Sequence, residues 1–171
     1  MVFSFLPLLL SCADVDPLIF EGVEVSSAWL EGARLSTGAF IIGRVRGGAD
    51  LFVEDPQGSI VSGPVSLRGG TAGFTADLIM TEFPLTDIPL QLPREALLGE
   101  DLLGRYKGSS ASFVSAIGVE THHLENEVGV EIDQAFLAVG VGMMWGYEWI
   151  TMAPIDEDSD TGDTGLDTGT P

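Results

Sequence analysis

Hydrophobic and polar residues alternate along much of the chain, and glycines interrupt the alternation at short intervals. Alternation predicts half-buried strands, because successive side chains of a strand point to opposite faces. The pattern predicts strands at 39–46, 51–54, 59–67, 73–80, 111–119, 127–133 and 135–152, the last of them broken near Gly146. Glycine and proline clusters at 46–48, 55–58 and 68–70 predict tight reversals. Together these elements predict an antiparallel meander.

Two segments favour short helices. Residues 18–35 place apolar side chains at roughly helical spacing, and residues 94–103 follow a proline-rich stretch and present leucines on one face. The apolar residues of these predicted helices are Phe20, Val23, Leu30 and Ala33 in the first segment and Leu97, Leu98 and Leu102 in the second. With 22 glycines and 9 prolines a helical bundle is disfavoured. The predicted fold is mainly β (α+β), a Gly-rich antiparallel sheet or barrel-like domain over 18–152 with one or two short helices.

The chain begins with an apolar stretch, from Val2 to Leu10, that is too short to span a bilayer as a helix. It predicts a signal peptide over 1–11. The following tetrad, Leu9-Leu10-Ser11-Cys12, resembles the lipobox of bacterial lipoproteins, which implies lipidation at Cys12, a tether over 12–17 and export to the cell envelope. The stretch lacks Lys and Arg, so the alternative is an apolar segment whose single cysteine is simply buried.

Residues 153–171 predict a disordered acidic tail, because from Asp156 onward six acidic residues accompany no basic residue and one apolar residue. Asp156, Asp158 and Asp160 alternate like the first three ligands of an EF-hand loop, which makes them weak calcium candidates. Thr161 and Asp167 stand where that loop requires glycine and glutamate. A solvated spacer is therefore the preferred interpretation.

Charge narrows the classes of partner. The chain has 26 acidic and 7 basic residues, a formal net charge of −19, and such a polyanion repels the phosphate backbone of nucleic acids. No basic residue follows Lys107. The distribution therefore predicts that the C-terminal half avoids an anionic membrane surface, and that any lipid binding is better to zwitterionic than to anionic vesicles.

Candidate catalytic residues are few. His122 and His123 lie near Glu120, Glu125 and Glu127, but the spacing fits no zinc signature. Adjacent histidines of a strand point to opposite faces and cannot bind one ion together, whereas in a turn they could. A solvated hairpin tip between Val119 and Val128 is the preferred interpretation. No G-x-S-x-G or P-loop motif occurs. We therefore expect a protein that is not an enzyme and has no metal or cofactor.

The aromatic residues concentrate near the end of the last predicted strand. Core packing is the first interpretation, since strands bury large side chains at alternate positions. The alternative is an apolar surface for lipid, where Trp and Tyr with one solvated end are favoured. The lipid-contact candidates are Met143, Trp145, Tyr147 and Trp149.

Several short segments match a known family pattern, which consists of a glycine-flanked strand, a second strand, a Pro-containing strand and small-residue segments. They are 38–43, 48–53, 62–67, 69–73, 76–80, 108–116 and 135–141. Together they resemble the SYLF domain, a lipid-binding family found in actin-regulatory proteins and bacterial lipoproteins. The resemblance implies a lipid ligand. It does not imply recognition of phosphoinositides, because the basic N-terminal helix of that family has no counterpart in residues 18–35.

Two functions of different class follow. The first is a non-catalytic, lipid-binding lipoprotein of the bacterial envelope, anchored at Cys12 and using an apolar surface around Trp145. The second is an acidic structural or interaction module that binds cationic or calcium-bridged partners.

Overall fold

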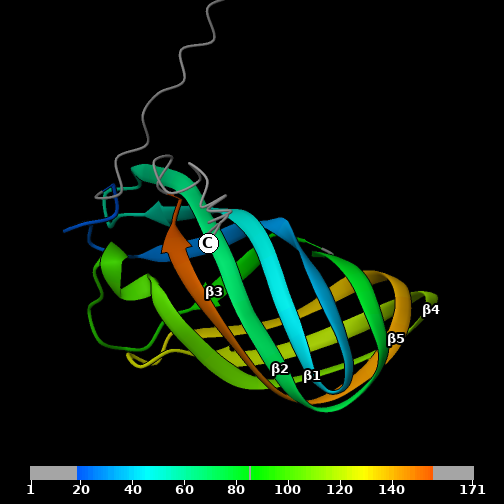
Figure 1. Cartoon of the computed structure of the whole chain (residues 1–171). Coiled ribbons are helices and arrows are strands. Elements are labelled where there is room, and N and C mark those ends of the chain that lie inside the picture. Colours follow the sequence, from blue (N-terminus) through cyan, green and yellow to red (C-terminus); the bar gives the residue numbers. More distant parts are fainter. Residues whose placement is uncertain (1–18, 85, 156–171) are drawn as a thin grey trace, which may run out of the picture.

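The computed structural model describes residues 19–84 and 86–155, which form one antiparallel sheet of four long strands and one short one. The long strands are β1 (Ser27–Glu54), β2 (Ile60–Pro84), β4 (Gly104–Glu125) and β5 (Glu131–Pro154). They lie side by side in the order β1, β2, β5, β4. The short strand β3 (Ile88–Gln91) continues the path of β2 and pairs with both β1 and β5 (Figure 1).

Each long strand bends near its middle, so the sheet curls over on itself (Figure 1). Irregular backbone marks the bends. The β1–β2 register shifts between Gly38 and Ile42, the β2–β5 register shifts between Ala76 and Ile79, and Ala116 of β4 has a φ of 70°. Such irregularities bend strands sharply. No ladder joins β1 to β4 within the described residues, so these two strands are the sheet edges.

The bends divide the molecule into two parts. The apex consists of residues 35–43, 71–81, 109–119 and 135–147, which contain the bends. The base holds the other described residues, including both hairpin turns and the 3-10 helix η1 (Gly99–Leu102), at the opposite end (Figure 1). The apex therefore contains only strand, and every loop belongs to the base.

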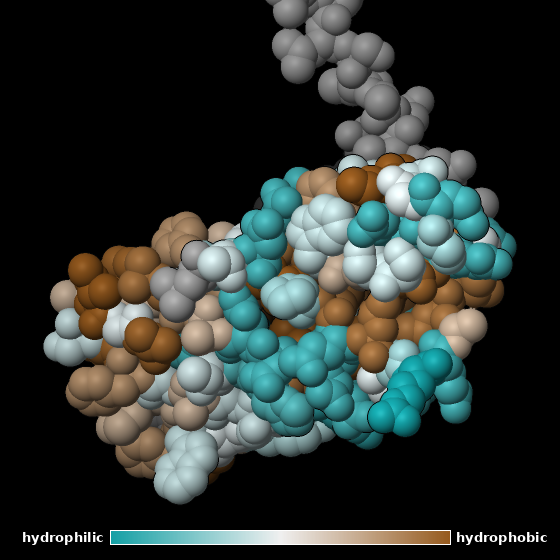
Figure 2. Space-filling model, turned by 180° about the vertical axis from the view of Figure 1, so that it is seen from behind, coloured by the Kyte–Doolittle hydropathy of each residue, from teal (hydrophilic) through white to brown (hydrophobic). Residues whose placement is uncertain are grey.

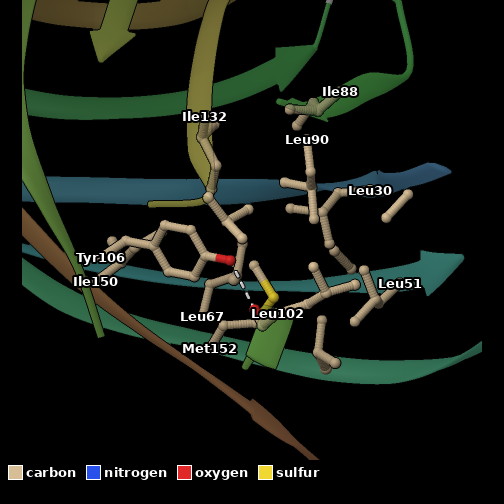
Figure 3. Close-up of a cluster of buried hydrophobic side chains, with 14 of the residues drawn as sticks. Leu30, Leu51, Leu67, Ile88, Leu90, Leu102, Tyr106, Ile132, Ile150 and Met152 are labelled. Carbon is tan, nitrogen blue, oxygen red and sulfur yellow. Dashed lines mark hydrogen bonds between the residues drawn. The ribbon is translucent and has the colours of Figure 1, made fainter. Parts of the chain in front are cut away.

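The main hydrophobic core fills the base. Its side chains come from all five strands and from η1, and the fully enclosed ones include Leu51, Val53, Val65, Leu102 and Tyr106. Tyr106 donates its hydroxyl proton to the carbonyl of Leu102 at 2.6 Å, so its one polar atom is satisfied among the aliphatic side chains (Figure 3). The segment before β1 closes this core, because Val25 and Gly99 donate backbone hydrogen bonds to Leu97 and Val23.

The mainly β prediction is confirmed, but the helices are not found in the described residues. Strand β1 occupies the second half of the first helix prediction, and only the 3-10 turn η1 lies in the second. Within β1, Ala28, Leu30 and Arg34 all point inward, a period of two. The apparent helical spacing arose because Phe20 joins the same core from a separate turn.

Seven short strands were predicted where the structure has four long ones. The reversal at Asp55 is present, with Gly58 at a φ of 82°. The reversals predicted at 46–48 and 68–70 are wrong, because both lie inside strands. Glycine at these positions allows neighbouring backbone to approach closely. A Cβ on Gly47 would lie 2.7 Å from the Ala33 carbonyl oxygen. Likewise β5 runs through Gly146 unbroken.

The loop between β4 and β5 also differs from the prediction. Strand β4 continues through both histidines to Glu125, and the turn falls at 126–130, inside the strand predicted for 127–133. Cys12 and the three calcium candidates, Asp156, Asp158 and Asp160, lie outside the described residues. Among the described residues, no helix has the length and apolarity needed to cross a membrane.

Candidate functional site

The outer surface of the apex is apolar. Its four segments contain a single charged residue, Asp77. Fifteen large hydrophobic side chains are exposed there or directly beside it, and we call them the apical patch: Leu35, Ile41, Ile42, Phe74, Ile79, Phe83, Phe113, Ile117, Val119, Leu137, Val139, Val141, Met143, Trp145 and Tyr147. Figure 2 shows the resulting apolar end of the molecule. The base exposes only scattered ones in its described part, namely Ile60, Leu98, Val128 and Ile155.

Strand pairing makes the apical patch continuous. On the outer face of the sheet, Phe83 pairs with Leu137 and Leu137 with Val119. On the other side of the bend, Phe74 pairs with Trp145, and Met143 pairs with Phe113. Directly opposite side chains on one face lie about 5 Å apart, which is contact distance for residues of this size. The patch is thus a single surface that spans several strands.

The structure places three of the four lipid-contact candidates in this patch. Trp145 is 77% exposed, Tyr147 45% and Met143 37%, so core packing is the wrong interpretation for them. Trp149 is half-buried just outside the patch, with its ring centroid 6.1 Å from that of Tyr147. Met144, on the opposite face of β5, is buried.

The interior of the apex is partly polar. Ser36, Thr71 and Ser112 are buried, and their hydroxyl oxygens have no hydrogen-bond partner among the described residues. A small apolar cluster of Met80, Val114, Ala138 and Met144 fills the remainder. The apex therefore has apolar side chains outside and a mixture of hydroxyl groups and apolar side chains inside.

A buried charge cluster lies where the apex meets the base. It consists of Arg34, Glu82, Glu120, His122 and Glu148, which come from all four long strands and are at most 5% exposed. Arg34 donates to Glu82 and, at 2.7 Å, to Glu148. His122 lies 2.8 Å from Glu148 through Nδ1, and its ring also contacts Arg34. The guanidinium is 4.9 Å from the Phe136 ring centroid.

The protonation states follow from burial and neighbouring charge. Burial raises the pKa of Glu120 to about 10, and the nearby Glu82 adds to the rise, so Glu120 is protonated at neutral pH. Burial would also raise the pKa of Glu148, but Arg34 and His122 outweigh it and hold that pKa at about 2. Burial, reinforced by Arg34, lowers the pKa of His122. His122 is therefore neutral and donates its Nδ1 proton to Glu148.

The cluster also has the geometry of a possible metal site, since ligand atoms of Glu82, Glu120 and His122 lie within 4.8 Å of one another. Arg34 already contacts Glu82 and His122, however, so a cation would have to displace its guanidinium. The cavity beside Arg34 and His122 has about 20 Å³, room for about one water. The arrangement is that of an internal ion network that joins the four strands.

Sequence reasoning did not identify this cluster. It assigned Glu120 and His122 to a solvated hairpin tip, whereas both are buried in β4. The two histidines do point to opposite faces of the strand, as expected, since His123 is exposed. A signal was present in the sequence. Each of the four apical segments, which together contain a single charged residue, is bordered by a cluster member, namely Arg34, Glu82, Glu120 and Glu148.

The chain was also compared with known proteins. No family model, curated protein or solved structure matches it.

Proposed function

We propose that this protein is a non-catalytic lipid-binding protein of the bacterial cell envelope that contacts lipid through the apical patch. The observation that carries the proposal is the gathering of fifteen exposed large hydrophobic side chains at one end. Large contiguous apolar patches on soluble monomers mark interaction surfaces. Full burial of one such side chain gains about 1.5–3 kcal/mol, so the patch offers a strong driving force for association.

Lipid is favoured over a protein partner by the polarity of the apex. A sheet that faces lipid carries apolar side chains outward and can hold polar ones inside, and the apex has apolar side chains outside and buried hydroxyl groups inside, beside a small apolar cluster. Trp145 and Tyr147 also suit a boundary between hydrocarbon and water. The unpaired backbone groups of edge strands β1 and β4 are costly in hydrocarbon. If the protein contacts lipid through the face of the sheet, its apolar side chains reach the hydrocarbon while the unpaired edges stay near the head groups.

Two features of the sequence support the same proposal. The Leu9-Leu10-Ser11-Cys12 tetrad would anchor the chain through lipid on Cys12, and the resemblance to the SYLF domain favours a lipid ligand. The acidic-module alternative gains nothing from the apex, which has one charged residue.

Vesicle cosedimentation tests the proposal. The full chain carrying Cys12→Ala, which removes any acyl anchor, should bind vesicles of phosphatidylcholine. Adding Phe113→Asn and Trp145→Asn should reduce the bound fraction at least tenfold, because both side chains are exposed in the patch. The matched control is Ile60→Asn with Val128→Asn, which removes two exposed apolar side chains from the base and should leave binding unchanged.

Circular dichroism of each variant separates lost contact from lost fold. Equal binding by folded apical and control variants would contradict the proposal, as would absence of binding by the parent chain.

A further inference from the structure

Five of the seven basic residues lie on one outer face of the base, directly beside the apex. They are Arg44, Arg46, Arg68, Arg105 and Lys107, and all five are exposed. They come from β1, β2 and β4, which are far apart in the sequence but belong to the same sheet. In a chain with a net charge of −19, this grouping gathers most of the basic residues on one face.

Strand register arranges these side chains in two adjacent rows, which we call the basic rows. In the first row, Arg46 pairs with Arg68, and both Arg68 and Arg105 pair with Thr151. In the second row, Arg44 pairs with Gly70, which pairs with Trp149, which pairs with Lys107. The rows are two residues apart along each strand, about 7 Å.

No carboxylate forms an ion pair with the basic rows within the described part of the chain, although Asp50 is exposed on the same face of β1, four positions beyond Arg46. The next outward positions on either side are uncharged: Gly48, Ser66 and Ala153 toward the loops, and Ile42, Ala72, Tyr147 and Ser109 toward the apex. Like charges directly opposite each other, as in Arg46 and Arg68, destabilise a sheet. An anionic partner bound on the basic rows would relieve this repulsion.

The order of surfaces along the sheet identifies that partner. The apical patch comes first and ends at Tyr147, then comes the second basic row, in which the Trp149 ring lies 6.1 Å from that of Tyr147, and the first basic row lies beyond it. A bilayer leaflet presents the matching order of acyl chains, interface and phosphate groups. We infer that the basic rows bind the phosphates of anionic phospholipids while the apical patch contacts the acyl chains. This inference rests on the proposed lipid-binding function.

The acidic residues make the orientation specific. Glu31, Glu125 and Asp133 are exposed on the other halves of the bent strands, whereas Asp50 is exposed on the same half of β1 as the basic rows. An anionic leaflet repels these groups and attracts the basic rows, so one face of the sheet turns toward the membrane. The expectation that net charge disfavours anionic vesicles does not take this segregation into account, because at 0.1 M salt charges act over only about 10 Å.

Vesicle binding tests the inference with the full chain carrying Cys12→Ala. The parent should bind vesicles of phosphatidylcholine with phosphatidylglycerol more tightly than phosphatidylcholine alone, and added salt should remove the difference. Changing Arg46, Arg68 and Arg105 to Gln should lower binding to the anionic vesicles about fivefold per residue. Binding to neutral vesicles should stay as in the parent. Arg94→Gln, an exposed arginine outside the rows, is the matched control and should change neither.

The outcomes separate the two proposals. Binding to both vesicle types with equal affinity, or an equal effect of Arg94→Gln, would overturn the inference and leave the proposed lipid function standing. Absence of binding to either type would overturn the proposed function as well. If double-stranded DNA removes the protein from anionic vesicles and binds it more tightly than they do, the partner is a polyanion and the inference fails.

Discussion

Base and apex are built from the same four strands, yet they distribute polarity differently. In the base, Leu51 and Val65 point inward with no exposed surface, while Arg46 and Arg68 point outward. In the apex, Trp145 and Ile41 point outward, while Ser36 and Ser112 point inward. The comparison teaches that alternation identifies a strand without identifying which of its faces is covered.

The change in polarity between base and apex occurs without a break in strand geometry at their boundary. In β1 the inward series Ala28, Leu30, Gly32, Arg34 and Ser36 continues from base to apex with a constant period of two. What changes is the residue type on each face, and the change falls at the buried charge cluster. The cluster thus forms the junction between two environments, and removing it should disturb both.

The largest effect is expected from Arg34→Met. The substitution leaves Glu82 and Glu148 buried without their cationic partner, which should cost about 3–5 kcal/mol in the free energy of unfolding. Urea denaturation measures the loss. Arg94→Met, at an exposed position in the base, should stay within about 0.5 kcal/mol of the parent. A loss below about 1 kcal/mol for Arg34→Met would mean that the cluster does not join the two parts.

A matched pair of truncations probes the two faces directly. Leu51→Ala should cost about 2–5 kcal/mol, because the side chain is fully buried in the base. Ile41→Ala, at an apical side chain that is 67% exposed, should cost less than about 0.5 kcal/mol. Thermal unfolding of both variants at low protein concentration gives the difference. A large loss at Ile41 would show that the apical patch is covered in solution, for example by a second copy.

The third test concerns pH. The folded pKa of Glu120, about 10, lies above the ordinary value of 4.5, so the folded state holds a proton that the unfolded state releases. Stability from this group is complete below pH 4.5 and falls as pH rises toward 10, by up to about 1.4 kcal/mol per pH unit. Glu120→Gln removes this dependence. Urea denaturation at pH 6 and 8 should show a smaller decline for the variant, and parallel declines would contradict the protonated state.

Much of the fold could be predicted from local pattern. Alternation located most of the strand residues, and Asp55-Pro56-Gln57-Gly58 located a hairpin turn. The glycines at 47 and 69 were misleading, because they allow close backbone approach as readily as they allow turns. Strand length was underestimated for the same reason.

The candidate site was predictable only in part. Met143, Trp145 and Tyr147 share one face of a strand by sequence alone, but whether that face is inside depends on every other strand. The charge cluster and the basic rows are harder to predict from the sequence. Arg34 meets Glu148, and Arg46 lies in one row with Arg105, only after residues distant in the sequence have paired.

The β2–β5 ladder also has a consequence for how the chain reaches this structure. The hairpins β1–β2 and β4–β5 close through short turns, whereas β2–β5 pairs residues as distant as Val65 and Pro154. Closing a long loop costs entropy before the long-range contacts form, so we expect this ladder to form last. Until it forms, each hairpin exposes both of its faces. A chain that emerges unfolded on the far side of a membrane would therefore meet lipid while its sheet is still open.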